Sequence, residues 1–343
     1  MKKNAIKIYI EGISIAALFL LTISCKKQTT PEAQIVQTNY VAPSEDYYAN
    51  LRAYKKSNHQ IFFGWFGNSA MANDSIINPA FRGGLDAIPD SVDIISCWGG
   101  VPQPGSREWK VMQSIKEKKG TRFVTVMFGS GVEALLKKND SALFFVTKDT
   151  MTAIDHVAKA ISDTINKYQV DGFDLDYETA FGDNTFFGKS GGSATNDRYT
   201  QRLFKAFSQY LGPQSGTGKL LIVDGQSDVG IIPYIDYFMQ QAYGSSSGSN
   251  LQSRMTTYGG SAFPASKFVP CENFESYWST GGVSFTDPLR GITPSLLGFA
   301  YWNPRQGGKG GCGAYHAEYD YGNPTQAYYY VRQAIQIMNP AAK

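Results

Sequence analysis

The segment Asp171-Gly172-Phe173-Asp174-Leu175-Asp176-Tyr177-Glu178 sets four carboxylates within eight residues and alternates the last three with large apolar side chains. Successive side chains of a β-strand point to opposite faces of the sheet. The last three acids would therefore share one face, and the three apolar side chains would share the other. This alternation predicts a strand that packs against helices on one side and carries a column of acids on the other.

The acid column favours proton-transfer chemistry over metal binding. Carboxylates crowded on a poorly hydrated face raise each other's pKa, and an acid that keeps its proton near neutral pH can act as a general acid. A calcium loop of the D-x-[DN]-x-[DN]-G type is the main alternative, but it needs its glycine after the third acid, and Gly172 precedes the column. A solvated acidic loop does not explain the bulky apolar residue at every second position. We expect neither a metal nor another cofactor.

This octet resembles the signature of glycoside hydrolase family 18, the chitinases and endo-β-N-acetylglucosaminidases, which reads D-G-x-D-x-D-x-E. All five defined positions match. The resemblance implies that Glu178 is the proton donor, that Asp176 orients the N-acetyl group of the substrate, and that Asp174 shares a proton with Asp176. It implies that Asp171 is a supporting acid at the strand entrance, and we count it among the substrate-binding residues. In this family the nucleophile belongs to the substrate.

The N-terminus predicts an export signal. Basic residues at 2, 3 and 7 precede an apolar stretch over 13–23, which is too short to span a bilayer as a stable helix. Its end, Leu21-Thr22-Ile23-Ser24-Cys25, resembles a bacterial lipoprotein signal. We therefore expect a signal peptide over 1–24 and lipidation of Cys25. An ordinary secretory signal and an uncleaved anchor are the alternatives.

The rest of the chain predicts a flexible polar tether over 25–57 and one folded domain over 58–343. The expected location is lipid-anchored at the outer membrane, with the side of that membrane left open. The chain resembles lipidated glycan hydrolases that sit beside outer-membrane glycan importers. A glycan substrate, the membrane and such an importer are thus the expected partners.

Composition excludes one class of partner and favours another. The net charge is +3 and 18% of the residues are charged, so the composition does not indicate a surface that binds nucleic acid. The 14% of aromatic residues leans towards carbohydrate, because sugar-binding clefts use flat aromatic faces. After Cys25 only Cys97, Cys271 and Cys312 remain, and their spacing fits no zinc motif. Three cysteines cannot all pair, so at most one disulfide links them.

Alternating strand and helix patterns predict a parallel sheet with crossover helices, and eight strands in this order predict a (β/α)8 TIM barrel. Helices are expected at 107–118, 153–168, 196–211 and 325–338. The expected strands are 60–66, 92–98, 122–128, 170–178, 220–224, 237–243, 267–270 and 296–302. Chemistry in this fold sits at the carboxyl ends of the strands, and Glu178 ends the fourth.

Aromatic residues end other predicted strands. Tyr243 closes the sixth and Trp302 the eighth, while Trp65 and Trp98 lie at the ends of the first two. By the family resemblance, Tyr243 bonds the substrate acetamide and Trp302 forms the floor under the reacting sugar. We expect Trp65, Trp98 and Gln241 to contribute to the substrate cleft. Core packing is the alternative for each aromatic residue.

Two segments depart from the chitinase pattern. Chitinases typically read M-x-Y-D on strand six, whereas this chain reads Gln241-Ala242-Tyr243-Gly244. A Gln-x-Tyr arrangement resembles the endo-β-N-acetylglucosaminidases that cut N-glycans. On strand three, the chitinase S-x-G-G is replaced by Phe128-Gly129-Ser130-Gly131. The departures favour an N-glycan substrate.

The sequence therefore predicts hydrolysis of the β-1,4 bond in the N,N'-diacetylchitobiose core of N-glycans, with retention of the anomeric configuration. A chitinase acting on chitooligosaccharides is the first alternative, since it uses the same chemistry. The second is a catalytically inactive glycan-binding surface lipoprotein. Chitinase-like lectins have usually lost the acid or an adjacent aspartate, and this chain keeps all four carboxylates.

Overall fold

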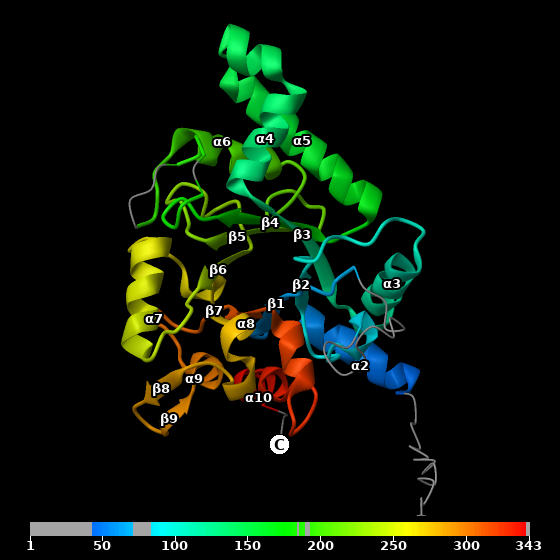
Figure 1. The fold of residues 1–343 in the computed structure, drawn as a ribbon, viewed down its shortest axis with the longest axis vertical. Coiled ribbons are helices and arrows are strands. Elements are labelled where there is room, and N and C mark those ends of the chain that lie inside the picture. The colour runs from blue at the N-terminus through cyan, green and yellow to red at the C-terminus, as the bar shows by residue number, and fades with distance from the viewer. Residues whose placement is uncertain (1–42, 71–83, 184, 189–192, 341–343) are drawn as a thin grey trace, which may run out of the picture. The chain divides into compact units, whose positions relative to one another are not determined.

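Eight parallel strands close into a barrel in the computed structural model of this protein, which describes residues 43–70, 84–183, 185–188 and 193–340. Figure 1 shows these strands as a ring. The predicted (β/α)8 barrel is thus confirmed. The barrel strands are β1 (Ile61–Trp65), β2 (Ile94–Ser96), β3 (Arg122–Phe128), β4 (Gly172–Tyr177), β5 (Leu220–Gly225), β6 (Tyr237–Gln241), β7 (Phe268–Asn273) and β10 (Gly311–Tyr315).

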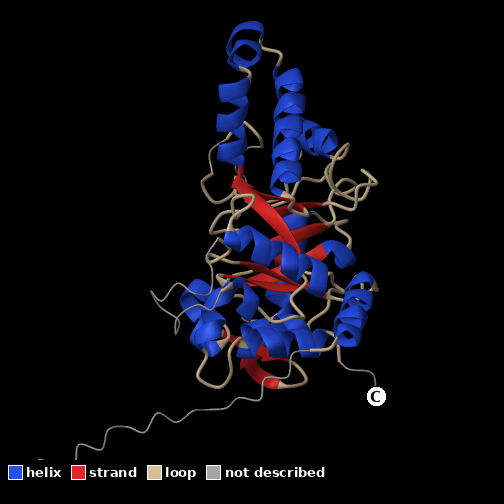
Figure 2. Ribbon diagram, turned by 90° about the vertical axis from the view of Figure 1, so that its right-hand side faces the viewer, coloured by secondary structure: helices blue, strands red, loops and turns tan. Residues whose placement is uncertain are grey.

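Helices cover the outside of this ring (Figure 2). The connection from β5 to β6 is made by turns instead, and a small antiparallel sheet of β8 (Ser284–Asp287) and β9 (Gly291–Pro294) is inserted after β7. The main helices are α2 (Glu45–Lys56), α3 (Arg107–Lys119), α4 (Gly129–Asn139), α5 (Thr150–Tyr168), α6 (Arg198–Phe207), α7 (Gly248–Arg254), α8 (Phe274–Tyr277), α9 (Ser295–Tyr301) and α10 (Tyr329–Met338).

Local sequence explains where these helices begin and end. Ser106 caps α3 by accepting a hydrogen bond from the backbone of Trp109, and Gly120 ends this helix in the left-handed conformation. Asp149 caps α5, and Asp197 caps α6. The helical stripe predicted for α5 is buried as expected: Ile154, Val157, Ile161 and Ile165 all pack into the core.

The barrel holds two separate cores. The apolar layer between strands and helices includes Phe173, Leu175 and Tyr177, the apolar face of the octet. A smaller cluster fills the inside of the barrel, namely Ile61, Phe63, Trp65, Ile94, Val124, Leu220, Ile222, Met239, Val269 and Cys271. Asp174 and Asp176 alternate with the outward-facing residues of β4, so the barrel interior turns from apolar to acidic towards the carboxyl ends of the strands.

Three acids at the amino end of the barrel share one arrangement. Asp93, Asp171 and Asp236 directly precede β2, β4 and β6, and each accepts a hydrogen bond from a backbone N–H of the preceding odd-numbered strand. The backbone N–H of the same acid donates to the carbonyl of that same partner residue. Each acid is therefore joined by two hydrogen bonds to one residue of the neighbouring strand, namely Phe62, Phe123 and Leu221 in turn. These paired hydrogen bonds fix the register of three strand pairs.

The eighth barrel strand is not where the sequence predicted it. The apolar run 296–302 forms helix α9 and its C-cap, because a short apolar run fits a buried helix as well as a strand. The true strand is the glycine-rich β10. A side chain at Gly311 would meet the carbonyl oxygen of Ile61 at 1.9 Å, and one at Gly313 would meet that of Phe63 at 2.5 Å. Glycine is required there because the backbones of β10 and β1 approach closely.

The predicted tether contains a helix. Helix α2 begins at Glu45 and packs on the amino end of the barrel, where Lys55 donates to the carbonyl of Val92 and to Thr121. Arg52 bonds the carbonyl of Lys118 in the same region. The compact unit accordingly runs over Ser44–Lys343. The predicted signal peptide and Cys25 lie outside the described residues.

Two further findings concern cysteines and membranes. Cys97, Cys271 and Cys312 are buried free thiols, so the disulfide left open by the sequence is not formed. Within the described part of the chain, the helices are all too short or too polar to cross a bilayer. In Figures 1 and 2, α4 and α5 run side by side and project from the barrel as a helical hairpin.

Candidate active site

Strand β4 directs its acids to one rim of the barrel. Asp174 and Asp176 point inside, and Glu178 follows the end of the strand directly. The octet's three apolar side chains pack on the opposite face, against the helices. The predicted division of the octet into an acid face and a core face is therefore confirmed.

Asp174 lies deepest and has the best-defined partners. Its Oδ2 accepts hydrogen bonds from Trp65 Nε1 at 3.0 Å and from Ser96 Oγ at 2.9 Å. Burial raises the pKa of Asp174 to about 7, and these two donors oppose that rise. Trp65 was expected to bind substrate, but its ring is only 2% exposed. It orients Asp174 instead of offering a surface to a sugar.

Asp176 lies above Asp174 and beside an acid that the sequence analysis left out. In the register of β4 and β5, Asp176 pairs directly with Asp224. Burial and the nearby Glu178 raise the pKa of Asp176 to about 8. Burial, followed by the charges of Asp176 and Asp174, raises the pKa of Asp224 well above its ordinary value. Like charges at this spacing cannot all ionise at neutral pH, so the cluster retains at least one proton.

Glu178 is half-buried at the mouth of the barrel. Burial raises its pKa, a hydrogen bond from Gln241 lowers it, and the charge of Asp183 raises it again. The Gln241 Nε2 also donates to Asp224 Oδ1 at 2.9 Å, so this side chain bridges β5 and the loop after β4. Glu178 therefore combines a raised pKa with access to the rim, the two properties that a general acid needs.

Tyr243, two residues beyond β6, lies beside these acids. Burial raises its pKa well above the ordinary value, and Asp224, Cys271, Asp176 and Glu178 add to the rise. The hydroxyl therefore stays protonated at neutral pH and remains a hydrogen-bond donor. The structure brings Tyr243 and Gln241 together with Asp174, Asp176 and Glu178, as the sequence predicted.

Two groups of aromatic rings flank the acids. Trp98 makes edge contacts with Tyr315 and Phe128 at centroid distances of 5.5 and 5.7 Å, and Phe128 is 40% exposed. The second group contains Phe181, which follows Glu178 by three residues and is 49% exposed. Its backbone N–H donates to the carbonyl of Glu178, and its ring lies 5.5 Å from that of Tyr258 in η3 (Met255–Gly259). Both faces are suited to stacking on sugar rings.

Two predicted substrate-binding residues lie elsewhere. Asp171 stands at the amino end of β4, about 23 Å along the strand from Glu178, where it pairs with Lys116 at 3.0 Å. The expectation that it binds substrate is wrong, although it does support the strand entrance. The prediction that Trp302 ends a strand is also wrong, because Trp302 follows α9. The centroid of its ring lies 6.1 Å from that of Phe268. Without that strand-end position, a sugar-floor role for Trp302 has no basis.

Sequence reasoning missed two residues of this rim. Asp224 ends an apolar strand, and an acid at the carboxyl end of a buried parallel strand is a signal that could have identified it. Tyr315 ends β10, 6.2 Å from the ring of Tyr243, where the sequence analysis expected Trp302 to lie. Its glycine-rich strand gave no such signal, because glycine is depleted in strands.

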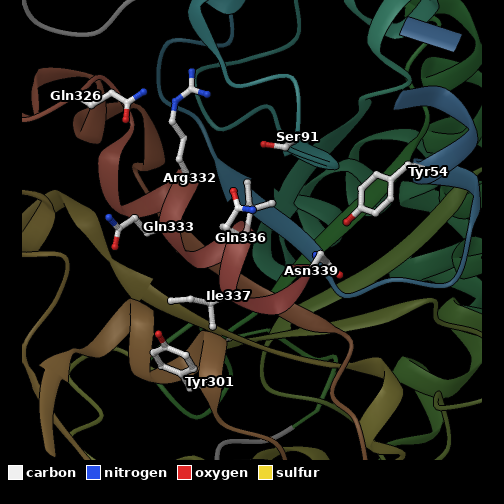
Figure 3. A pocket seen from close by; sticks show the side chains of 10 residues that line it. Tyr54, Ser91, Tyr301, Gln326, Arg332, Gln333, Gln336, Ile337 and Asn339 are labelled. Atoms are coloured by element: carbon white, nitrogen blue, oxygen red, sulfur yellow. The ribbon is translucent and has the colours of Figure 1, made fainter. Parts of the chain in front are cut away.

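A hollow elsewhere on the molecule lacks the chemistry of this rim. It has a volume of about 710 Å³ and lies at the amino end, between α2 and α10, where its lining includes Tyr54, Ser91, Arg332 and Asn339 (Figure 3). Among the described residues, no carboxylate lines it. Across residues 43–70, 84–183, 185–188 and 193–340, no three His, Cys, Asp or Glu side chains are grouped to hold a metal ion. Proton transfer by the acid rim is the chemistry that the described residues support.

Comparison with known proteins identifies relatives with this architecture. The family model for glycoside hydrolase family 18, BT1044-like, matches residues 27–337. Endo-beta-N-acetylglucosaminidase F2 of Elizabethkingia meningoseptica is 27% identical over 358 residues, covering 96% of this chain and 98% of the relative.

Two solved structures share the fold. A variant of BT1044 superposes with a TM-score of 0.71 at 24% identity, covering 88% of this chain and 94% of that one. The endo-beta-N-acetylglucosaminidase of Cordyceps militaris superposes with a TM-score of 0.60 at 22% identity, covering 88% and 98%.

Proposed function

The chain belongs to glycoside hydrolase family 18, and from this premise we propose that it is an endo-β-N-acetylglucosaminidase that cuts N-glycans. The bond hydrolysed is the β-1,4 bond of the N,N'-diacetylchitobiose core. One observation carries the proposal. Where chitinases have a methionine before the tyrosine of strand six, this chain has Gln241, which hydrogen-bonds both Asp224 and Glu178. The relative named endo-beta-N-acetylglucosaminidase F2 supports the same specificity.

The reaction begins with protonation of the leaving group. Glu178 donates its proton to the glycosidic oxygen as the bond to C1 breaks, and the acetamide oxygen of the same sugar attacks C1. The product of this step is an oxazolinium ion. Asp176 accepts a hydrogen bond from the acetamide nitrogen and stabilises its developing positive charge. The hydroxyl of Tyr243 donates to the acetamide oxygen and holds it in line with C1.

The second step regenerates the enzyme. Glu178, now a carboxylate, takes a proton from a water molecule, and the resulting hydroxide attacks C1 from the face that the leaving group left. The oxazolinium ring opens and the acetamide is restored. Two inversions at C1 give net retention. The raised pKa of Glu178 suits it to both roles, since the group must hold a proton in one step and accept one in the next.

Mass spectrometry of a high-mannose glycoprotein incubated with the purified protein tests the proposal. The expected protein product keeps one N-acetylglucosamine on asparagine, and the Glu178→Gln variant should yield none. Chitin oligomers run in parallel separate the alternatives. Cleavage of the oligomers alone would make the protein a chitinase, and cleavage of neither substrate, with glycan binding intact, would make it a binding protein.

The location is a separate proposal that rests on sequence. We propose that residues 1–24 are removed, that Cys25 is lipidated, and that the enzyme acts at the outer membrane beside a glycan importer. The intact mass of the full chain extracted from membranes tests the first two points. Loss of 1–24 with acyl chains on Cys25 is expected, and a chain with an unmodified Cys25 would contradict the proposal. Co-purification of an outer-membrane transporter with the lipidated chain tests the third.

A further inference from the structure

Asp224 places a third buried carboxylate beside the two inward-facing acids of the octet. The side chain is 0% exposed and lies at the carboxyl end of β5, in direct register with Asp176. Besides burial, the charges of Asp176 and Asp174 both act on its carboxyl group and raise its pKa. Its other neighbour is Gln241, whose Nε2 donates to Asp224 Oδ1 at 2.9 Å.

The hydrogen-bond partners of these acids leave three oxygens without a donor. Asp174 Oδ1, Asp176 Oδ1 and Asp224 Oδ2 are all buried, and none of them has a hydrogen-bond donor among the described groups. A carboxylate can only accept, whereas a protonated carboxyl also donates. One proton shared among the three groups therefore satisfies two of the three oxygens at once: the oxygen that carries it and the one that receives it. Without that proton, all three would be desolvated and unpaired.

Asp224 is the best of the three to carry this proton. Asp174 accepts two hydrogen bonds, from Trp65 and Ser96, and such bonds favour its charged form. Asp224 accepts one, from the neutral amide of Gln241, and is slightly less exposed than Asp176. The titratable groups that face it are Asp174 and Asp176 from β4, Glu178 after β4, Tyr243 after β6 and Cys271 of β7. All of these are acidic or neutral.

We propose that Asp224 is a positioning residue of this site, a neutral carboxyl group whose Oδ2 donates to the acids of β4 while its Oδ1 holds Gln241 beside Glu178. The consequence for catalysis concerns Asp176, which must be charged and correctly turned when positive charge develops on the acetamide. A donor at Asp224, on the neighbouring strand β5, stabilises that charge. A second anion there would push Asp176 out of position. The inference of a role in turnover rests on the proposed function, whereas the protonation of Asp224 does not.

Two substitutions of similar shape separate positioning from packing. Asp224→Asn keeps an acceptor for Gln241 and supplies a permanent N–H donor to the β4 acids. Asp224→Leu fills the same space with neither. In the full chain we expect Asp224→Asn to keep kcat within about tenfold of wild type, and Asp224→Leu to lose about 100-fold or more in kcat with little change in KM. A role in packing alone would give two variants with equal kcat, which would overturn the proposal.

Infrared spectroscopy gives a readout that needs no substrate. The difference spectrum of wild type minus Asp224→Asn at neutral pH should contain the carbonyl band of one protonated carboxylic acid. Asp228 is the matched control, because it is equally buried but has two donors on each oxygen. Its Asn variant should instead lose a carboxylate band. A carboxylate band lost from Asp224→Asn would overturn the proposal, even if no glycan tested is cleaved by wild type.

Discussion

The acids at the two ends of the barrel have the same chemistry and opposite surroundings. At the amino end, Asp93, Asp171 and Asp236 each accept a backbone N–H from the neighbouring strand, and Asp171 also pairs with Lys116. At the carboxyl end, Asp174, Asp176 and Asp224 each keep one buried oxygen without a donor. Satisfied acids hold strands in register. Burial raises the pKa of each unsatisfied acid, so the cluster keeps a proton.

The difference also shows how the fold separates stability from function. The amino-end acids act locally, each on one residue of the adjacent strand. The carboxyl-end acids act as a group, since each alters the ionisation of the others. A substitution at one end should therefore change the free energy of unfolding, and a substitution at the other should change the rate.

The largest effect is expected at the carboxyl end. Asp176→Asn should lower kcat by about 10²–10³-fold, because it removes the charge that stabilises the acetamide. The same variant should unfold at an equal or higher temperature at pH 8, since one of the crowded charges is gone. Steady-state kinetics and thermal melts check both parts. A variant that loses stability along with activity would break the contrast between the two ends.

The next effect belongs to the amino end. Asp171→Asn should lower the free energy of unfolding by about 2 kcal/mol, because it weakens a charge-assisted bond to the backbone of Phe123 and removes the pair with Lys116. Its kcat should stay at the wild-type level. Urea unfolding measures the change, with Asp163→Asn as the control. Asp163 belongs to an exposed pair with Lys159, so its loss should change the free energy of unfolding far less than the loss of Asp171.

The pH dependence of stability sharpens the comparison. Because the folded-state pKa of Asp174 is about 7 and that of Asp176 about 8, against about 4 for an unfolded aspartate, the folded state binds more protons in between. Stability should therefore fall as pH rises from about 4 to about 8, by roughly 1.4 kcal/mol per unit of pKa difference. Urea midpoints across this range should decline, and more shallowly in Asp176→Asn. Midpoints that rise over the range would contradict the buried-acid account.

The smallest effect concerns the exposed aromatic faces at the acid rim. Phe181→Ala should raise KM about fivefold, equivalent to roughly 1 kcal/mol of lost stacking, and leave kcat unchanged. Phe145→Ala is the control, since Phe145 is 53% exposed in η2 (Ala142–Thr147), at the tip of the hairpin of α4 and α5. Equal KM values for both variants would show that Phe181 does not contact the glycan.

The sequence predicted the parts of the site that depend on local alternation. Asp174, Asp176 and Glu178 could be placed on one face because a strand has a period of two, and Glu178 could be placed at a strand end because the next residues break the pattern. Asp224 could not be placed beside them. Its contact with Asp176 depends on the register of two strands that are about 45 residues apart, which neither segment encodes alone.

The prediction of the eighth strand was wrong for a related reason. The run 296–302 has the composition of a buried strand, and Gly311–Tyr315 has the composition of a loop. What decides between them is the space beside Ile61 and Phe63, where only glycine fits. That constraint comes from closing the barrel. It moved the rim's last aromatic residue from Trp302 to Tyr315.

Helix α2 covers the end of the barrel that lies opposite to the acid rim. It packs beside Val92, Lys118 and Thr121, all at the amino end. The amino ends of the strands are therefore capped by a helix, whereas the carboxyl ends at Glu178 are left uncovered by it.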